Sequence, residues 1–177
     1  MSLPHALLTA LIERPGSGLE LAGRFDRSIG YFWSATHQQI YRELARLERD
    51  GLIKSKREAD ARGRKRIYRV LPAGHAELKA WLVLDDELPP LRDAMMVRLR
   101  AEAAVGPSGL GPVIQRRLER HQEKLAQYRL IEARDFAATP ATGADALRHL
   151  ILQTGIRHEA NWIDVLSEAL TLVERPQ

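Results

Sequence analysis

The chain has 177 residues, a formal net charge of +4 at pH 7, 45% hydrophobic residues and 28% charged residues. This composition is ordinary for a soluble globular protein, and the length suffices for one domain or for two small ones. The absence of cysteine excludes disulfides and thiolate chemistry. Because the apolar runs are too short to span a membrane and no basic leader begins the chain, the expected location is the cytoplasm.

The charge is distributed unevenly along the chain. Residues 1–82 hold 15 Lys and Arg against 9 Asp and Glu, whereas residues 83–177 hold 12 against 14. Residues 53–70 alone hold 8 basic and 2 acidic side chains. This asymmetry favours a polyanionic partner for the first half, and the alternative is a solvated basic face.

Three helices are predicted in the first 50 residues, over 3–13, 19–26 and 35–50. Pro4 fits the first turn of the first helix, where a missing N–H has no consequence. Ser17 and Ser34 are the expected N-caps of the second and third helices, and Gly51 suits the end of the third.

The periodicity changes after the third helix. Residues 52–59 and 65–71 are short runs rich in Ile, Tyr and Val, which favour strands, with the polar turn DARGR between them. A helix is predicted over 72–82, and the acidic, proline-containing segment 83–91 is expected to be a boundary. Three helices followed by a basic hairpin predict a winged helix-turn-helix DNA-binding domain over residues 1–84.

Residues 92–177 are expected to form a second, helical domain, so that the fold class is mainly α. Helices are predicted over 92–104, 113–137 and about 145–173. In the last two, apolar or large residues recur at helical spacing: Ile114, Leu118, Leu125, Tyr128, Leu147, Ile151, Thr154, His158, Trp162, Val165, Ala169 and Leu172. Long, thin amphipathic helices usually pack against copies of themselves, so this domain is expected to form a homodimer.

The third helix has two contrasting faces. Ile40, Leu44 and Leu47 form a core stripe on a helical wheel. The opposite face is polar and basic, with Gln38, Arg42, Ala45 and Arg49 flanked by Ala35, Gln39, Tyr41 and Arg46. In a DNA major groove Gln pairs with adenine and Arg with guanine, while hydroxyl groups and arginines also reach phosphates. The outer face therefore predicts DNA reading, and the alternative is a surface helix with solvated charges.

Residues 3–82 resemble the PadR family of bacterial transcriptional regulators. The resemblance lies in SGLEL at 17–21, in FWSATHQQIYRELARLERDGL at 32–52, and in the spacing of Tyr68, Gly74, Leu78 and Trp81. The C-terminal part looks like that of the longer PadR subfamily, whose last domain is helical and dimeric. The resemblance implies a homodimeric repressor that binds a near-palindromic operator and releases it when a small molecule binds. Founding members of the family answer to phenolic acids.

Carried over by position, the resemblance implies DNA contacts on the third helix and at the wing: Ser34, Thr36, His37, Gln38, Gln39, Tyr41, Arg42, Gly63, Arg64 and Lys65. The alternative for His37 is a partly buried imidazole bonded to a neighbouring carbonyl.

Arg157, His158 and Trp162 are the candidate effector-binding residues, because a basic pair beside an aromatic ring suits an aromatic carboxylate. The alternative is that Trp162 belongs to a dimer or interdomain core. No cofactor is expected, and no metal, because the histidines lack the spacing of a helical metal site. Without a nucleophile elbow, P-loop or Rossmann fingerprint, an enzyme is not expected. The rival function is a protein-interaction adaptor that uses the winged fold without DNA.

Overall fold

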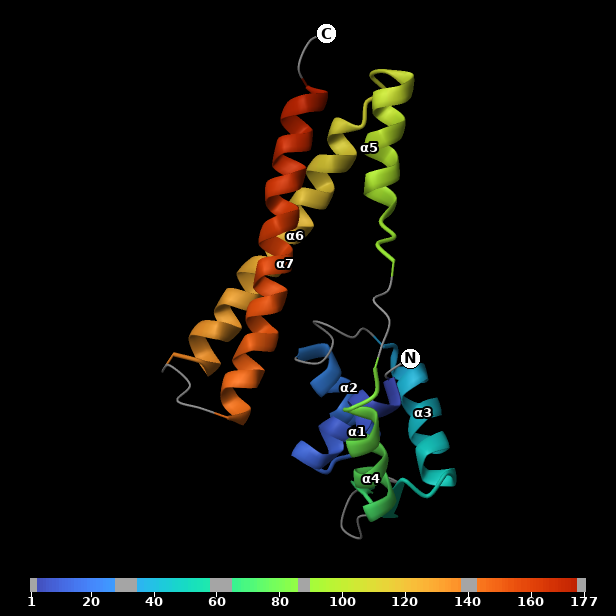
Figure 1. Cartoon of the computed structure of the whole chain (residues 1–177). Coiled ribbons are helices and arrows are strands. Elements are labelled where there is room, and N and C mark those ends of the chain that lie inside the picture. Colours follow the sequence, from blue (N-terminus) through green and yellow to red (C-terminus); the bar gives the residue numbers. More distant parts are fainter. Residues whose placement is uncertain (1–2, 28–34, 58–64, 86–89, 138–142, 175–177) are drawn as a thin grey trace. The chain divides into compact units, whose positions relative to one another are not determined.

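The structure is a computed structural model that describes residues 3–27, 35–57, 65–85, 90–137 and 143–174. It is mainly helical with one two-stranded sheet, as the sequence predicts (Figure 1). In chain order the elements are α1 (Leu3–Glu13), α2 (Gly18–Arg27), α3 (His37–Arg49), β1 (Ile53–Arg57), β2 (Arg66–Val70), α4 (Pro72–Trp81), α5 (Ala94–Val105), α6 (Gly111–Asp135) and α7 (Ala144–Val173). None of the helices in the described ranges is long and apolar enough to cross a membrane.

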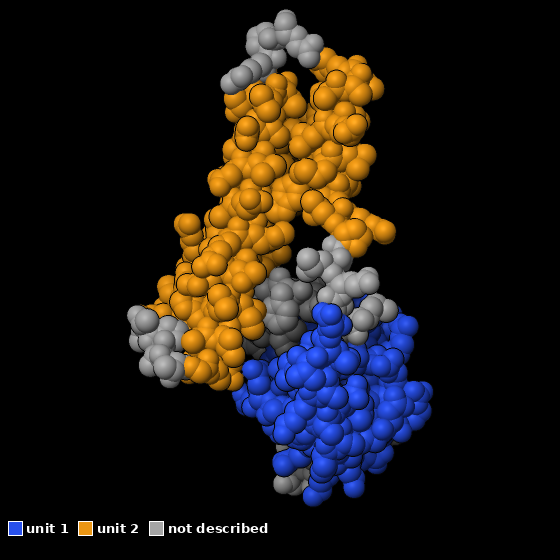
Figure 2. Space-filling model, in the orientation of Figure 1, with its two compact units in different colours: residues 1–88 blue, residues 89–177 orange. Residues whose placement is uncertain are grey.

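The chain divides into two compact units, Met1–Leu88 and Pro89–Gln177 (Figure 2). The first, here called the winged unit, contains α1 to α4 and the hairpin. The second, here called the helical unit, contains α5 to α7. Each unit has its own cluster of buried hydrophobic side chains, so each is described by itself.

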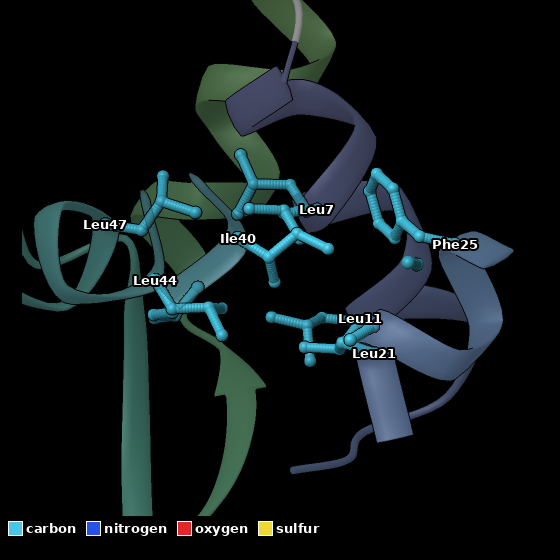
Figure 3. Close-up of a cluster of buried hydrophobic side chains, with 11 residues drawn as sticks. Leu7, Leu11, Leu21, Phe25, Ile40, Leu44 and Leu47 are labelled. Carbon is cyan, nitrogen blue, oxygen red and sulfur yellow. The ribbon is translucent and has the colours of Figure 1, made fainter. Parts of the chain in front are cut away.

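One side of each of the first three helices forms the core of the winged unit. Figure 3 shows these side chains converging between the helices. The fully buried members are Leu7, Leu8, Ala10, Leu11, Leu21, Ala22, Phe25, Ile40, Leu44, Leu47 and Ile53. Burying one large aliphatic or aromatic side chain of this kind stabilises a fold by about 1.5–3 kcal/mol. The core stripe predicted for the third helix is therefore confirmed, and its burial fixes which face of α3 is left outside.

Helix α3 begins at His37, and its N-cap is Thr36. The Gln39 backbone N–H donates to the Thr36 hydroxyl at 3.2 Å, while the Thr36 backbone N–H donates to the Gln39 side-chain oxygen at 2.8 Å. This reciprocal capping box satisfies two N–H groups at the start of the helix. The prediction that Ser34 caps this helix is therefore wrong, because the carboxamide that completes the box lies three residues after Thr36.

The sheet is an antiparallel hairpin in which Ile53 pairs with Val70 and Arg57 pairs with Arg66. The turn between α1 and α2 adds an isolated bridge to it, between Gly16 and Tyr68. The Tyr68 N–H donates to the Gly16 carbonyl at 2.9 Å, and the Gly16 N–H donates back at 3.4 Å. The wing is thus held by backbone hydrogen bonds to the turn that precedes α2.

In the helical unit, α6 and α7 lie side by side (Figure 1). Near one end of this pair, Met95 of α5 joins a buried cluster with Ile114 and Leu118 of α6 and with Leu166 of α7. Farther along, the ring of Tyr128 lies directly over Gly155, where an added Cβ would be 3.0 Å from Tyr128 Cε2. The small residue therefore lets the two helices approach closely at this level.

The apolar stripe predicted on the last helix is unevenly buried along α7. Its Ala169 is buried and its Trp162 packs against the core of the unit, whereas Leu147, Ile151 and Leu172 are 63%, 48% and 56% exposed. At about 100° per residue, most of the exposed members lie roughly a quarter turn around the helix from Leu166. The predicted stripe therefore lies beside the most deeply buried line of α7, and most of its members stay partly exposed.

Candidate nucleic-acid interface

The side of α3 opposite the core is exposed, polar and basic. Gln38, Arg42, Ala45 and Arg49 are all exposed. They lie on one flank of the helix because Ile40, Leu44 and Leu47 hold the other flank in the core. The small Ala45 at mid-helix leaves room for a flat surface to approach the backbone. This arrangement presents two long donors from the first turns of the helix to the outside.

The arginines of α3 are not equivalent. Arg46 Nε lies 3.0 Å from Glu43 Oε1, and Arg49 Nε lies 3.0 Å from Asp50 Oδ1. Arg42 has no ion pair with any carboxylate of the described residues. Among the arginines of α3 it is therefore the one whose charge is not already paired with a carboxylate of the described residues.

Not every expected contact residue of α3 has its side chain available. Thr36 and Gln39 are exposed, but their polar groups are joined in the capping box. His37 is exposed in the first turn, which does not fit its alternative as a partly buried imidazole. Tyr41 is 47% exposed, with one edge of its ring against Gly18. These positions favour Gln38 and Arg42 as base readers, with Thr36 and Gln39 fixing the helix start.

The outer face of the wing carries a set of cations that the carried-over residue set did not include. Lys54, Lys56 and Arg69 are exposed, and Lys54 stands directly opposite Arg69 across the hairpin. Like charges facing each other across two strands destabilise a hairpin, and an external anion relieves that repulsion. The basic run and the alternation of the strands were both visible in the sequence and could have identified these residues.

Carboxylates of α2 and α3 hold the wing against the helices. Lys65 Nζ lies 3.2 Å from Glu20 Oε1 of α2. The Ser55 backbone N–H of β1 donates to Glu48 Oε1 of α3 at 2.7 Å, and hydrogen bonding by Ser55 lowers the pKa of Glu48. The reading helix and the wing are therefore joined through polar contacts as well as through the core. Ser34, Gly63 and Arg64 lie outside the described residues.

In the helical unit, the expected effector set is not brought together. Trp162 is half-buried, with the Arg117 guanidinium 4.3 Å from its ring centroid and the His121 ring stacked on it at 5.7 Å. Arg157 and His158 are exposed, and in the described part of the chain Arg157 forms no cation–π contact with Trp162 and His158 does not stack on it. The basic groups beside the indole therefore come from α6, about 40 residues earlier than the sequence analysis placed them.

Around Trp162 runs a polar network with a buried acid at its centre. Glu159 is 2% exposed, and its carboxylate lies 2.5 Å from His121 Nδ1 and 3.2 Å from Lys124 Nζ. Arg117 forms two hydrogen bonds with Asp93, at 3.0 and 2.7 Å, which hold the pKa of Asp93 below its usual range. Sequence periodicity had no signal for this network, because it joins residues far apart in the chain. Among the described residues no group of acidic or histidine side chains is arranged to hold a metal ion.

Two family models match the chain, one for each unit. Residues 7–80 match the transcriptional regulator PadR-like family, and residues 91–174 match the virulence activator alpha C-terminal model. A curated relative from Mycobacterium tuberculosis, named "Probable transcriptional regulator Rv1176c", is 40% identical over 96% of this chain and 98% of its own length. The chain therefore belongs to the PadR-like family of transcriptional regulators, as the sequence predicts.

Solved structures show the same fold over the whole length. Bacillus subtilis PadR in complex with operator DNA is 24% identical, with a TM-score of 0.84 over 98% of this chain and all of that one. The same relative in complex with p-coumaric acid has a TM-score of 0.80, over 99% of this chain and all of that one. The Vibrio cholerae virulence activator AphA is 29% identical, with a TM-score of 0.81 over 97% and 98% of the two chains. These similarities confirm the winged helix-turn-helix fold and the helical second unit.

Proposed function

We propose that the chain is a ligand-responsive repressor that binds a near-palindromic operator as a homodimer in the cytoplasm. In this proposal α3 enters a major groove, with Gln38 and Arg42 contacting base edges, and the wing binds phosphates through Lys54, Lys56, Lys65 and Arg69. His37 and Tyr41 contact the backbone from the flanks of α3. Ser34, Gly63 and Arg64 belong to the same set by resemblance to the family.

The observation that carries the proposal is the contrast between Arg42 and the other arginines of α3. A surface helix with solvated charges gains from intrahelical ion pairs, and Arg46 and Arg49 each have one. Arg42 lacks such a pair and lies one turn after Gln38, beside Ala45. Two adjacent long donors beside a small residue suit base readout in a groove, which a protein-interaction adaptor does not need.

The exposed apolar face of α7 supports the homodimer. Leu147, Leu150 and Ile151 are 63%, 49% and 48% exposed and lie within one turn of each other on α7. Obligate dimer interfaces are rich in apolar residues and often bury more than about 2,000 Å². Ile151→Glu should convert the dimer to a monomer while helix content stays unchanged, because the interface would bury an unpaired charge. Light scattering at micromolar concentration measures the molar mass of both proteins. If the wild-type protein is a monomer, the proposed homodimer is wrong.

DNA binding is tested with the region upstream of the gene that encodes the chain. Fluorescence anisotropy should show tighter binding to that duplex than to an unrelated duplex of the same length and base composition. A reporter fused to the same region should rise when the gene is deleted. Equal affinity for both duplexes would contradict specific reading, and no binding to either would favour the adaptor. A reporter that falls would identify an activator.

The effector part of the proposal names an aromatic carboxylic acid such as p-coumaric acid. It is supported by the cations that surround Trp162 and by the relative solved with that acid. To release the operator, the acid must bind the DNA-free form more tightly than the DNA-bound form. Calorimetry with p-coumaric and ferulic acids should show binding that Trp162→Ala weakens. If Arg157→Ala and His158→Ala do not change the affinity for the acid, those two residues do not bind the effector.

A further inference from the structure

The turn between α1 and α2, with the sequence Gly16-Ser17-Gly18, touches every element to which the proposed function assigns DNA contacts. Gly16 bridges to Tyr68 of the wing. Ser17 is joined to Glu20, and Glu20 forms an ion pair with Lys65, the residue just before β2. The third residue, Gly18, lies against the side chain of Tyr41 on α3. Three consecutive residues thus meet the wing, α2 and the reading helix.

Ser17 and Glu20 fix the direction in which α2 leaves this turn. Glu20 Oε2 accepts hydrogen bonds from the Ser17 N–H at 2.7 Å and from the Ser17 hydroxyl at 3.0 Å, and the Glu20 N–H donates back at 3.3 Å. This is a second capping box, like that of α3. The backbone hydrogen bond from Ser17 is the main cause that lowers the pKa of Glu20 to about 2. The first residue of α2 is therefore held in a fixed place.

At Gly18 the requirement is for space. Its φ is not positive, so any residue could adopt the backbone conformation. A Cβ added there would be 2.3 Å from Tyr41 Cε1, a distance that real Cβ atoms essentially never show, and a tight 3.0 Å from both Cδ1 and Cζ. Gly18 is buried although its neighbour Leu19 is 68% exposed, because the Tyr41 ring covers it. The ring occupies the place where any other residue would put its side chain.

The position of the Tyr41 ring bears directly on the outer face of α3. At about 100° per residue, Tyr41 lies roughly 60° around the helix from Gln38. With one edge of the ring fixed on Gly18, the rest of the side chain remains 47% exposed beside the proposed base readers. A ring that is fixed before DNA arrives loses less conformational freedom on binding than a mobile one.

We infer that Gly18 is a positioning residue for DNA binding, which acts by holding the Tyr41 ring against the start of α2. The inference rests on the proposed function, because it assigns to Tyr41 a contact with the DNA backbone. Gly18 itself touches no DNA. A side chain at this position displaces the ring and removes its contact, while the cores of both units stay intact.

A double-mutant cycle on the full chain tests the inference. Anisotropy with the upstream duplex should show about tenfold weaker binding for Gly18→Ala and for Tyr41→Ala, the loss of roughly one hydrogen bond to a charged group. Because both changes remove the same contact, adding Gly18→Ala to Tyr41→Ala should change the affinity less than about twofold. The matched control is Gly111→Ala, at the first residue of α6, where an added Cβ meets nothing closer than 3.8 Å. That variant should bind like wild type.

A measurement without DNA separates this inference from the proposed function. The Gly18 α-proton resonances of the free protein should show a ring-current shift that Tyr41→Ala abolishes. If wild type shows the shift but binds no duplex, the proposed function fails, and the DNA role of Gly18 fails with it. If wild type binds DNA and Gly18→Ala binds it equally well, only the positioning role is overturned. The same holds if Gly18→Ala weakens binding in the Tyr41→Ala background as much as it does in wild type. Wild-type affinity in Tyr41→Ala has the same consequence.

The possibility that Gly18→Ala does not fold is covered by the double variant. Removing the Tyr41 ring opens the space that the new methyl group needs. Recovery of cooperative unfolding in Gly18→Ala with Tyr41→Ala would show that the ring was the obstacle, and would support the contact. Failure to recover would show that Gly18 serves the fold by another route, and would overturn the inference.

Discussion

The winged unit and the helical unit bury their apolar residues in different ways. In the winged unit, α1, α2, α3 and β1 all contribute side chains of 0–1% exposure to a single cluster. In the helical unit the buried cluster is smaller, and α7 keeps Leu147, Leu150 and Ile151 about half exposed or more. A unit with a closed core is able to fold alone, whereas an open apolar face calls for a partner. Under the proposed function, DNA is read by the unit with the closed core, and pairing with a second copy falls to the unit with the open apolar face.

The largest effect is expected from separating the two units. A fragment that ends at Asp85 keeps the whole cluster of the winged unit, so it should fold, but as a monomer. Without the second reading helix it should bind the operator about 100- to 10,000-fold more weakly than the full chain, because two linked half-sites bind far more tightly than one. Light scattering and anisotropy of the fragment measure both properties. A fragment with full operator affinity would show that the helical unit has no part in binding.

A core substitution tests the closed cluster of the winged unit. Leu44→Ala should lower the free energy of unfolding by about 2–5 kcal/mol, through lost burial and the cavity that remains. Leu19, 68% exposed on α2, provides a matched control in the same unit, and Leu19→Ala should change stability by less than about 0.5 kcal/mol. Urea titrations followed by circular dichroism give both values. Similar losses in the two variants would contradict a single closed core.

The reading face is tested by a pair of arginines on one helix. Arg42→Ala should weaken specific binding by about 1–3 kcal/mol, the value of one good base contact. Arg49→Ala removes an equal charge that is already paired with Asp50, and should weaken binding less. Gln38→Ala should behave like Arg42→Ala. If all three variants bind like wild type while folded, another surface reads the operator.

The wing should affect affinity without affecting sequence preference. Lys56→Ala should weaken binding to any duplex, and should reduce the slope of log affinity against log salt by about one unit. Lys65→Ala should act in the same direction but less, because Lys65 Nζ is paired with Glu20 Oε1 in the free protein. The measurement is a salt series with both the upstream and the unrelated duplex. If a variant changes the preference between the two duplexes while the salt slope stays the same, the residue contacts bases and not phosphates.

The smallest effect concerns the acid stability of the winged unit. The pKa of Glu20 falls from 4.5 to about 2 in the folded protein, so its ionised form stabilises the fold above pH 4.5. That contribution is lost as the pH falls from about 4.5 to about 2. Glu20→Gln keeps the cap but not the charge, and should flatten this part of the stability curve. Thermal unfolding at a series of pH values checks it, and an unchanged curve would contradict the ionised cap.

The elements and the core of the winged unit were predictable because each depends on local pattern. Ile40, Leu44 and Leu47 recur at helical spacing and have one core to face. The cap of α3 was missed although its signal was present: Thr36 has Gln39 three residues later, whereas Ser34 has no carboxylate or carboxamide at that spacing. The start of a helix is therefore better predicted from the complete box than from one hydroxyl.

The helical unit was less predictable because its contacts are distant in sequence. Apolar residues surround more than half of α7, so periodicity alone could not show which side α6 would cover. The partners of Trp162 are Arg117 and His121, and no local pattern connects them to it. The role of Gly18 could not be predicted for a different reason. Glycine is required there because the Tyr41 ring fills the space of a side chain, and only the structure shows where that ring lies.

The facing cations of the wing give salt two opposite effects on this protein. Lys54 stands opposite Arg69, so the free hairpin contains a repulsive pair, whereas Arg66, opposite Arg57, is 4.0 Å from a carboxylate oxygen of Glu48. Dissolved ions screen this repulsion, and they equally screen the attraction between the wing and phosphates. Rising ionic strength should therefore make the unbound hairpin more stable while it makes the complex with DNA weaker. Loss of DNA binding at high salt is therefore no sign that the protein has unfolded. The hairpin of the free protein should be most stable at the ionic strength at which its affinity for DNA is lowest.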